Sequence, residues 1–308
     1  MKASNVLGRA ALLAMAFIGR FTSAEAACNY SDPTVSLSIQ SPGSAAGVQV
    51  SVARIHASVS AGNLQSGSSS NCSNFSSSSA YIYVGNRYIG NGSVNWNTAE
   101  VGDGRHLIRV DVTDSNGGRA SAQQYIEVRN NWIHPLVWNH HEYVRLNPDV
   151  ANAFGGELSR TLSHWLYYGI REGRQATRAF SSMEYMQSYG DLQAAFGANG
   201  PALVDHYIRH GVHEGRVGVF ALRPEVWNVH YYYAIHPDLQ AAFPGDVEAL
   251  KRHWLEYGVN EGRRAKETFS APNYLANHGD LRAAYGYNYR EGIKHYIVYG
   301  IYEGRSGN

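Results

Sequence analysis

The sequence predicts a multidomain chain, an antiparallel β-sandwich followed by an all-α domain of helical repeats. Residues 30–130 alternate apolar and polar side chains with the period of a β-strand. After residue 131 the apolar spacing becomes helical, and a pattern of His, Gly and Glu-Gly-Arg recurs four times. At 308 residues, the chain is long enough for about two domains.

The N-terminal residues have the features of a secretory signal peptide, predicted to span 1–26. A positively charged start precedes the apolar run 10–19, which is too short to cross a bilayer, and the small-x-small sequence AEA at 24–26 is a cleavage site. The mature chain is therefore expected to be exported to the periplasm, the cell surface or the medium. A lipoprotein anchored through Cys28 is the alternative, although Glu25 stands where such signals carry a Leu-like residue.

The first part of the mature chain, residues 27–130, contains short runs with period-two alternation. Gly-Asn, Asn-Gly and Asp-Gly pairs, which are typical of tight turns, separate several of them. About seven such strands in about 100 residues favour an antiparallel β-sandwich. The predicted strands cover 34–40, 48–60, 80–84, 88–90, 93–98, 106–113 and 122–128.

The sequence contains two cysteines, Cys28 and Cys72. In an exported chain such a pair is expected to form a disulfide. It would close a loop of about 45 residues and stabilise the fold by roughly 2–4 kcal/mol. Cys72 lies in the Ser-rich segment 66–79, which is predicted to be a long loop tied to the N-terminal edge of the domain.

The segment "YVGNRYIG…WNT…DGRHLIRVDVTDSNGGRASAQQYIEV" resembles the C-terminal half of bacterial Ig-like domains of extracellular proteins. The resemblance implies an Ig-like fold and a role as a spacer. Asp111 and Asp114 are possible Ca²⁺ ligands, but turn-forming aspartates are the favoured interpretation. The residues that match the family pattern, in order, are Asp103, Gly104, His106, Leu107, Val110, Asp114 and Gly117.

The second part, residues 131–308, contains four similar segments, called copy one to copy four in chain order. They cover about 138–174, 180–216, 227–263 and 269–305, and in each an Asp precedes a His by 15 residues and the His precedes a Gly by five. Copies one and three share WN, PD and HW, whereas copies two and four share FS, GD and HY, which indicates two duplicated pairs. The recurring residues are Asp149, Asp191, Asp238, Asp280, His164, His206, His253, His295, Arg174, Arg216, Arg263 and Arg305.

Copy four illustrates the helices that each segment predicts. A first helix is expected from Pro272 to about Asn277, with Ser270 as its cap. Asp280 is the predicted N-cap of a second helix, and Gly300 is the predicted residue with positive φ at the end of a third. The side chains expected to point inward are Leu281, Ala284, Tyr285, Ile293, Tyr296, Ile297 and Ile301.

The fourfold recurrence of Asp, His, Glu and Arg favours structural ties over catalysis, because a catalytic site needs one set of residues. Each His is expected to bond a backbone carbonyl, and each Arg to fork onto a carboxylate or onto terminal carbonyls. We predict no catalytic residue, no cofactor and no metal. The group His134, His140, His141 and Glu142 is interpreted as interdomain contacts and solvated polar residues, with a metal site as the alternative.

The pattern Y-L-x4-D-L-x-A-A-F…H-Y-x3-G-x2-E-G-R resembles short helical repeats in secreted or surface bacterial proteins. Such repeats often stand beside Ig-like modules, Ca²⁺-binding arrays or hydrolase domains, which implies an extracellular or surface role. We predict a non-enzymatic interaction protein that binds polysaccharide or a protein partner through the repeats. A glycan or cell-wall hydrolase that uses the repeat carboxylates and a structural subunit of an extracellular assembly are the alternatives. The candidate contact residues are Tyr167, Tyr168, Tyr231, Tyr233, Tyr299 and Tyr302.

The charge pattern argues against other classes of partner. The formal net charge is +1 and no block of Lys and Arg stands out, so neither nucleic acid nor an anionic membrane surface is an expected ligand. No integral membrane span is predicted, because no apolar run reaches 18 residues.

Overall fold

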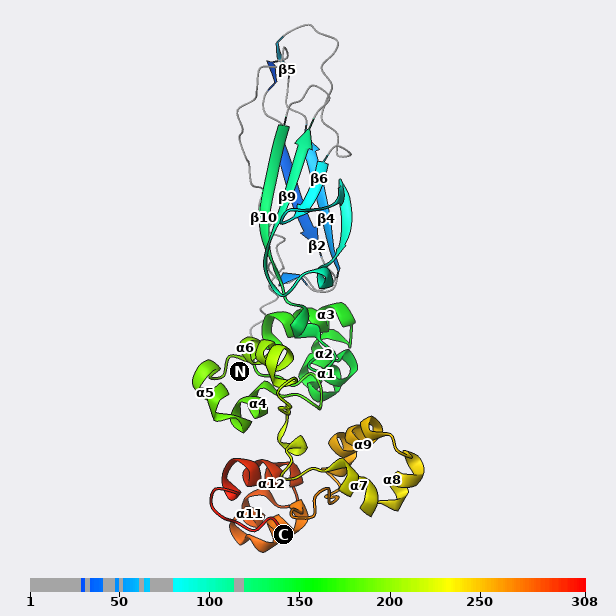
Figure 1. Ribbon diagram of the computed structural model, residues 1–308, viewed down its shortest axis with the longest axis vertical. Helices are drawn as coiled ribbons and strands as arrows, with labels where there is room; N and C mark the ends of the chain where they lie inside the picture. The colour runs from blue at the N-terminus through cyan, green and yellow to red at the C-terminus, as the bar shows by residue number, and fades with distance from the viewer. Residues whose placement is uncertain are drawn as a thin grey trace, which may run out of the picture. The chain divides into compact units, whose positions relative to one another are not determined.

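The computed structural model describes residues 29–30, 34–40, 48–49, 52–60, 64–66, 80–113 and 119–308. The predicted signal peptide, both cysteines, most of the Ser-rich loop and Asp114 lie outside these ranges. The chain divides into two compact units, Met1–Asn130 and Asn131–Asn308. Figure 1 shows the change from strands in the first unit to short helices in the second.

The strands of the first unit form two larger sheets and one small one. Their orders are β3-β10-β9-β6-β7, β2-β4-β8 and β1-β5, and every described pair is antiparallel except β3–β10. The predicted run 48–60 is thus divided between sheets, because β3 pairs with β10 whereas β4 pairs with β2 and β8. The strands are β1 (Asn29–Tyr30), β2 (Thr34–Gln40), β3 (Val48–Gln49), β4 (Val52–Ser60), β5 (Leu64–Ser66), β6 (Ala80–Val84), β7 (Arg87–Asn91), β8 (Ser93–Asn97), β9 (Gly104–Thr113) and β10 (Arg119–Val128).

The two larger sheets share one hydrophobic core. Ile55 on β4 and Trp96 on β8 belong to the same buried cluster as Ile82 on β6 and Val110 on β9. Successive side chains of a strand point to opposite faces, so one face of each sheet supplies this core. In β6, for example, Ala80, Ile82 and Val84 are buried and the residues between them are not.

In the second unit, each copy folds as three short α-helices followed by a single π-helical turn. Copy one has α1 (His140–Leu146), α2 (Pro148–Phe154), α3 (Leu158–His164) and η4 (Trp165–Gly169); copy two has α4 (Ser182–Ser188), α5 (Gly190–Phe196), α6 (Gly200–His206) and η5 (Tyr207–Gly211). Copy three has α7 (Val229–Ile235), α8 (Pro237–Ala242), α9 (Val247–His253) and η7 (Trp254–Gly258); copy four has α10 (Ala271–Asn277), α11 (Gly279–Tyr285), α12 (Tyr289–His295) and η8 (Tyr296–Gly300).

Side-chain caps and helix breakers keep these helices short. The first helix of each copy begins after an Asn or Ser whose side chain accepts a backbone N–H, and Ser270 does so for α10 as predicted. Asp280 is not the cap of α11; it is the second residue of that helix, and His278 occupies the N-cap position. Leu281, Ile293 and Ile297 are buried as predicted, but Ala284 and Ile301 are exposed.

Aromatic stacking builds the interior of each copy. The first aromatic of a copy stacks on the aromatic that follows the recurring His, for example Trp138 on Trp165 at 5.6 Å between ring centroids and Phe269 on Tyr296 at 4.6 Å. The end of each copy returns to its start, since Gly307 O accepts a hydrogen bond from Ser270 N. A copy is therefore held closed by both its core and its backbone.

Candidate functional site

A tyrosine–histidine pair forms the centre of each copy. A fully buried tyrosine of the first helix places its hydroxyl against Nδ1 of the recurring His, which ends the third helix 21 residues later. The oxygen–nitrogen distances are 2.7, 3.0, 2.9 and 2.9 Å from copy one to copy four. The pairs are Tyr143–His164, Tyr185–His206, Tyr232–His253 and Tyr274–His295.

The ionisation of this pair follows from its surroundings. Burial raises the pKa of Tyr274 to about 12, so its hydroxyl is protonated at neutral pH. Burial and the charge of Arg174 lower the pKa of His164, so its ring is neutral. Because a buried hydroxyl needs an acceptor, we assign the tyrosine as donor to Nδ1, which leaves the proton of the imidazole on Nε2. The predicted bond from this His to a backbone carbonyl is thus replaced by a bond to a tyrosine.

The recurring Gly five residues after the His makes room for the tyrosine hydroxyl. A Cβ at Gly169 would lie 2.2 Å from the Tyr143 hydroxyl oxygen, and one at Gly300 would lie 2.2 Å from that of Tyr274. Neither Gly has a positive φ, so the prediction for Gly300 was wrong. These Gly residues end the π-helical turn, and their missing side chain is what permits the close approach.

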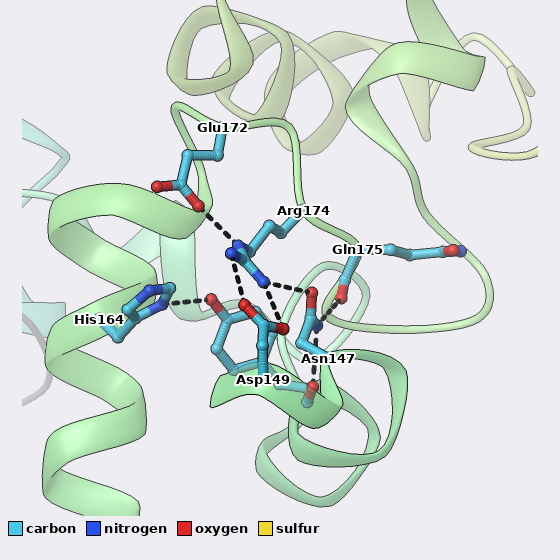
Figure 2. A network of polar contacts seen from close by, with 7 residues as sticks. Asn147, Asp149, His164, Glu172, Arg174 and Gln175 are labelled. Atoms are coloured by element: carbon cyan, nitrogen blue, oxygen red, sulfur yellow. Dashed lines mark hydrogen bonds and ion pairs between the residues drawn. The ribbon is translucent and has the colours of Figure 1, made fainter. Parts of the chain in front are cut away.

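A second set of contacts joins the end of each copy to its second helix through the recurring Arg, and Figure 2 shows this set in copy one. Arg174 forms an ion pair with Asp149 at 2.8 Å and with Glu172 at 2.5 Å, and it donates a hydrogen bond to Asn147. Gly173 adopts φ +70°, which turns the chain so that the guanidinium folds back. In the other copies the Arg–Asp distances are 2.9, 2.7 and 2.9 Å, for Arg216–Asp191, Arg263–Asp238 and Arg305–Asp280.

These ion pairs hold the recurring carboxylates in the charged state. The hydrogen bond from Arg174 lowers the pKa of Asp149, and those from Arg263 and Arg305 do the same for Asp238 and Asp280. The sequence-based prediction that the Arg forks onto a carboxylate is confirmed. One Arg thus pairs with two carboxylates in each copy, and the set is repeated rather than unique.

Outside this network, each recurring His lies between two aromatic rings. In copy one, the His164 ring centroid is 5.6 Å from that of Phe154 and 5.7 Å from that of Tyr168. Copy three repeats this with Phe243 and Tyr257, at 6.1 and 5.6 Å from His253. Copy four places Tyr285 and Tyr299 around His295, and copy two has His210 in place of the second tyrosine.

The second of these two rings is exposed to solvent in copies one, three and four. Tyr168, Tyr257 and Tyr299 are 59%, 52% and 55% exposed, and each stands four residues after the His of its copy. Sequence reasoning selected Tyr168 and Tyr299 but missed Tyr257, although the common spacing from the His identifies it. We call Tyr168, Tyr257 and Tyr299 the surface tyrosines.

The other candidate tyrosines do not share this position. Tyr302 is 85% exposed and Tyr167 is 37% exposed, but none of the corresponding residues of the other copies is a tyrosine. Tyr231 and Tyr233 are half-buried, and Tyr233 packs against the core. They are therefore weaker candidates for contact with a ligand.

The histidine-rich segment near the start of the second unit is engaged in separate contacts. Thr161 forms a hydrogen bond with His140, and His134 accepts one from the backbone of Leu136. Glu142 accepts a hydrogen bond from Arg178 N at 2.6 Å. In the described part of the chain, no group of three or more His, Cys, Asp or Glu is placed to hold a metal ion.

Comparison of the chain with protein-family models, curated proteins and solved structures finds no match. No helix within the described ranges has the length and apolar character needed to cross a membrane. A function for this chain is therefore inferred from the geometry of the copies themselves.

Proposed function

We propose that the chain is an exported, non-enzymatic protein that binds polysaccharide through four helical repeats, with an Ig-like β-sandwich as a spacer. The observation that carries this proposal is the recurrence of the surface tyrosines, which are held at the same place by the same His in three of the four copies. Export is proposed from the signal-peptide features at residues 1–26.

The surface tyrosines have the properties that a sugar-binding ring needs. A tyrosine ring offers a flat apolar face and a hydroxyl, so that it can pack on the C–H face of a sugar and still hydrogen-bond. Each ring already contacts the recurring His of its copy before a ligand binds. The tyrosine side chain therefore loses less conformational entropy on binding. The half-buried His also has its Nε2–H as a donor beside the ring.

Several equivalent rings on one chain suit a polymer with repeating units. Each ring contact contributes little alone, but linked contacts to one polymer raise the overall affinity through their high effective concentration. Copy two has His210 at the position of the surface tyrosines, so we expect it to contribute less than the other three.

The charge state of the repeat carboxylates favours binding over hydrolysis. A glycoside hydrolase uses an acid whose pKa is raised beside a second carboxylate. In copies one, three and four the Arg lowers the pKa of the recurring Asp instead, and burial at Asp191 is outweighed by Arg216 so that its pKa is lowered too. The recurring Asp residues therefore lack the raised pKa that the acid of the hydrolase alternative needs.

A glycan array that includes bacterial polysaccharides tests the proposal. We expect the mature chain to bind a limited set of polysaccharides without releasing reducing ends. Capture of a protein partner without binding to any glycan would replace this proposal by a protein-binding module. Concentration-dependent filaments without glycan binding would replace it by a structural subunit of an extracellular assembly. Release of reducing ends would replace it by the hydrolase.

A further inference from the structure

A cavity of about 300 Å³ lies between copy two and copy four. Its walls come from α4, from the 3₁₀ turn η6 (Phe220–Leu222) and from α12, and their charged residues are Glu184, Arg290, Glu291 and Lys294. This volume is at the lower end for small-molecule sites and suits a ligand the size of one sugar ring. None of the surface tyrosines lines it.

Arg290 brings an unpaired positive charge to this cavity. Among the described residues, its guanidinium forms no ion pair and donates one hydrogen bond, to Leu255 O at 3.3 Å. Burial and the charge of Arg178 lower the pKa of this guanidinium, and the charges of Glu184 and Glu291 raise it only in part, so that its pKa is lowered overall. A guanidinium has five N–H donors, and buried charges are normally paired. Arg290 therefore keeps donors for an anion.

Glu184 brings an acceptor to the same cavity. One carboxylate oxygen accepts a hydrogen bond from Phe220 N at 2.8 Å, and no contact in the described part of the chain occupies the other. Burial raises its pKa. Glu184 and Arg290 both line the cavity but form no ion pair with each other, so a ligand between them can use both.

The corresponding cavity between copies one and three shows that the fold does not require Arg290. That cavity, of about 310 Å³, contains Glu142 at the place of Glu184, and Glu142 accepts Arg178 N as Glu184 accepts Phe220 N. Copy three precedes copy four by 42 residues, so the residue that corresponds to Arg290 is Glu248. The Glu248 side chain is largely exposed and lies 4.0 Å from Lys251. Arg290 thus has no counterpart in the second cavity, which is lined instead by Arg178, whose buried Nε has no hydrogen-bond partner among the described residues.

We propose that the cavity between copies two and four binds a hexuronate, an acidic sugar unit. This proposal rests on the polysaccharide binding proposed above and specifies the class of sugar that is bound. Arg290 binds the sugar carboxylate as a planar fork. Lys294, one helical turn further on α12, is a second cation at the cavity and forms an ion pair at 3.6 Å with Glu291, which also lines it. The carboxylate of Glu184 accepts hydrogen bonds from sugar hydroxyls.

Calorimetric titration of the mature chain with D-glucuronate, D-glucose and acetate tests this proposal. We expect saturable binding of glucuronate and none of glucose or acetate. Arg290→Gln should weaken glucuronate binding at least about tenfold, as the loss of a charged hydrogen bond does, whereas Glu248→Gln, its counterpart in the other cavity, should leave it unchanged. Since Arg290 is a buried and poorly paired cation, Arg290→Gln should not lower the melting temperature.

If Arg290→Gln does not fold, Lys294→Gln supplies the same test from the more exposed end of the site. Equal binding of glucose or acetate, or unchanged glucuronate affinity in these variants, overturns the hexuronate site. Neutral polysaccharides bound on the array, without glucuronate binding in solution, refute this site and leave the polysaccharide function standing. Glucuronate binding without any glycan bound on the array keeps the cavity site and refutes the wider function.

Discussion

The hydroxyl oxygen of Tyr143 lies 2.7 Å from Nδ1 of His164, and the same pair recurs in the three later copies. The contact joins the first helix of a copy to the end of its third. It also fixes the His ring that contacts the surface tyrosine, here Tyr168 at 5.7 Å between ring centroids. The buried pair and the exposed ring are thus parts of one arrangement, and the predictions below test each part.

Gly169→Ala should destabilise the protein because of the Tyr143 hydroxyl. The added Cβ would lie 2.2 Å from that oxygen but 3.2 Å from the next nearest atoms. We expect a loss of roughly 1–3 kcal/mol, as for other overpacked sites. Tyr143→Phe alone should cost about 1 kcal/mol by removing one hydrogen bond, yet it should restore part of the stability of Gly169→Ala. Urea unfolding of both single variants and the double variant measures this coupling.

Gly215→Ala is the matched control for that cycle, because Gly215 has φ +70° and nothing near its absent side chain. Adding Tyr143→Phe to Gly215→Ala should give the sum of the two losses. If the losses of stability of Gly169→Ala and Tyr143→Phe were also additive, the Tyr143 hydroxyl would not be the reason that Gly169 tolerates no side chain.

Gly304→Ala should destabilise for a different reason, since Gly304 has φ +68° and open space around it. An L-residue in this left-handed region costs roughly 1–2 kcal/mol. Asn tolerates the region better than Ala, so Gly304→Asn should lose less. Thermal unfolding compares the two variants, and an equal loss for both would argue against backbone conformation as the cause.

Stability should fall as the pH drops from 7.5 to about 5. Burial lowers the pKa of His164, His206, His253 and His295 below the ordinary 6.5. Between the folded and unfolded pKa values the unfolded chain binds more protons, so the free energy of unfolding decreases with decreasing pH. Urea midpoints across this range measure the effect.

His295→Gln is the variant that isolates one contribution to this slope. It should make the pH dependence shallower, because one of the four lowered pKa values is removed. Glu184, whose pKa is raised, acts in the opposite direction at the acid end but is common to both proteins. An identical slope in the variant would mean that His295 does not titrate as described.

Asp191→Asn and Asp238→Asn should lower the melting temperature by similar amounts. Each removes a carboxylate that is paired with the Arg of its own copy, at 2.9 and 2.7 Å. Differential scanning calorimetry measures the stability, and release of reducing ends from polysaccharide measures turnover. Turnover in the wild type that disappears in only one of two folded variants would support the hydrolase alternative.

Period and turn signals were sufficient to predict many of the elements. The predicted strands 34–40 and 80–84 coincide with β2 and β6, because alternation over a half-buried sheet leaves a clear period of two. The helix expected from Pro272 to Asn277 differs from α10 by one residue, since Ser270 and Pro272 mark its start.

Tertiary contacts explain what the sequence left undecided. A recurring Gly shows that a side chain is not tolerated, but not whether the cause is a positive φ, as at Gly304, or a neighbouring atom, as at Gly300. The partner of His295 is Tyr274, which lies 21 residues earlier. Its constant spacing in all copies is visible in the sequence, yet spacing alone does not reveal a hydrogen bond.

The affinity of the full mature chain for the polysaccharide that it binds best on the array tests the central claim most directly. It should be compared with the affinity of the triple variant Tyr168→Ala, Tyr257→Ala, Tyr299→Ala. Tyr287→Ala is the matched control, because Tyr287 is 71% exposed and lies over Arg282 rather than beside a recurring His. We predict a loss of at least about tenfold for the triple variant, from roughly 0.5–1.5 kcal/mol per ring, and none for the control. Equal affinities of the wild type and a folded triple variant would contradict the claim.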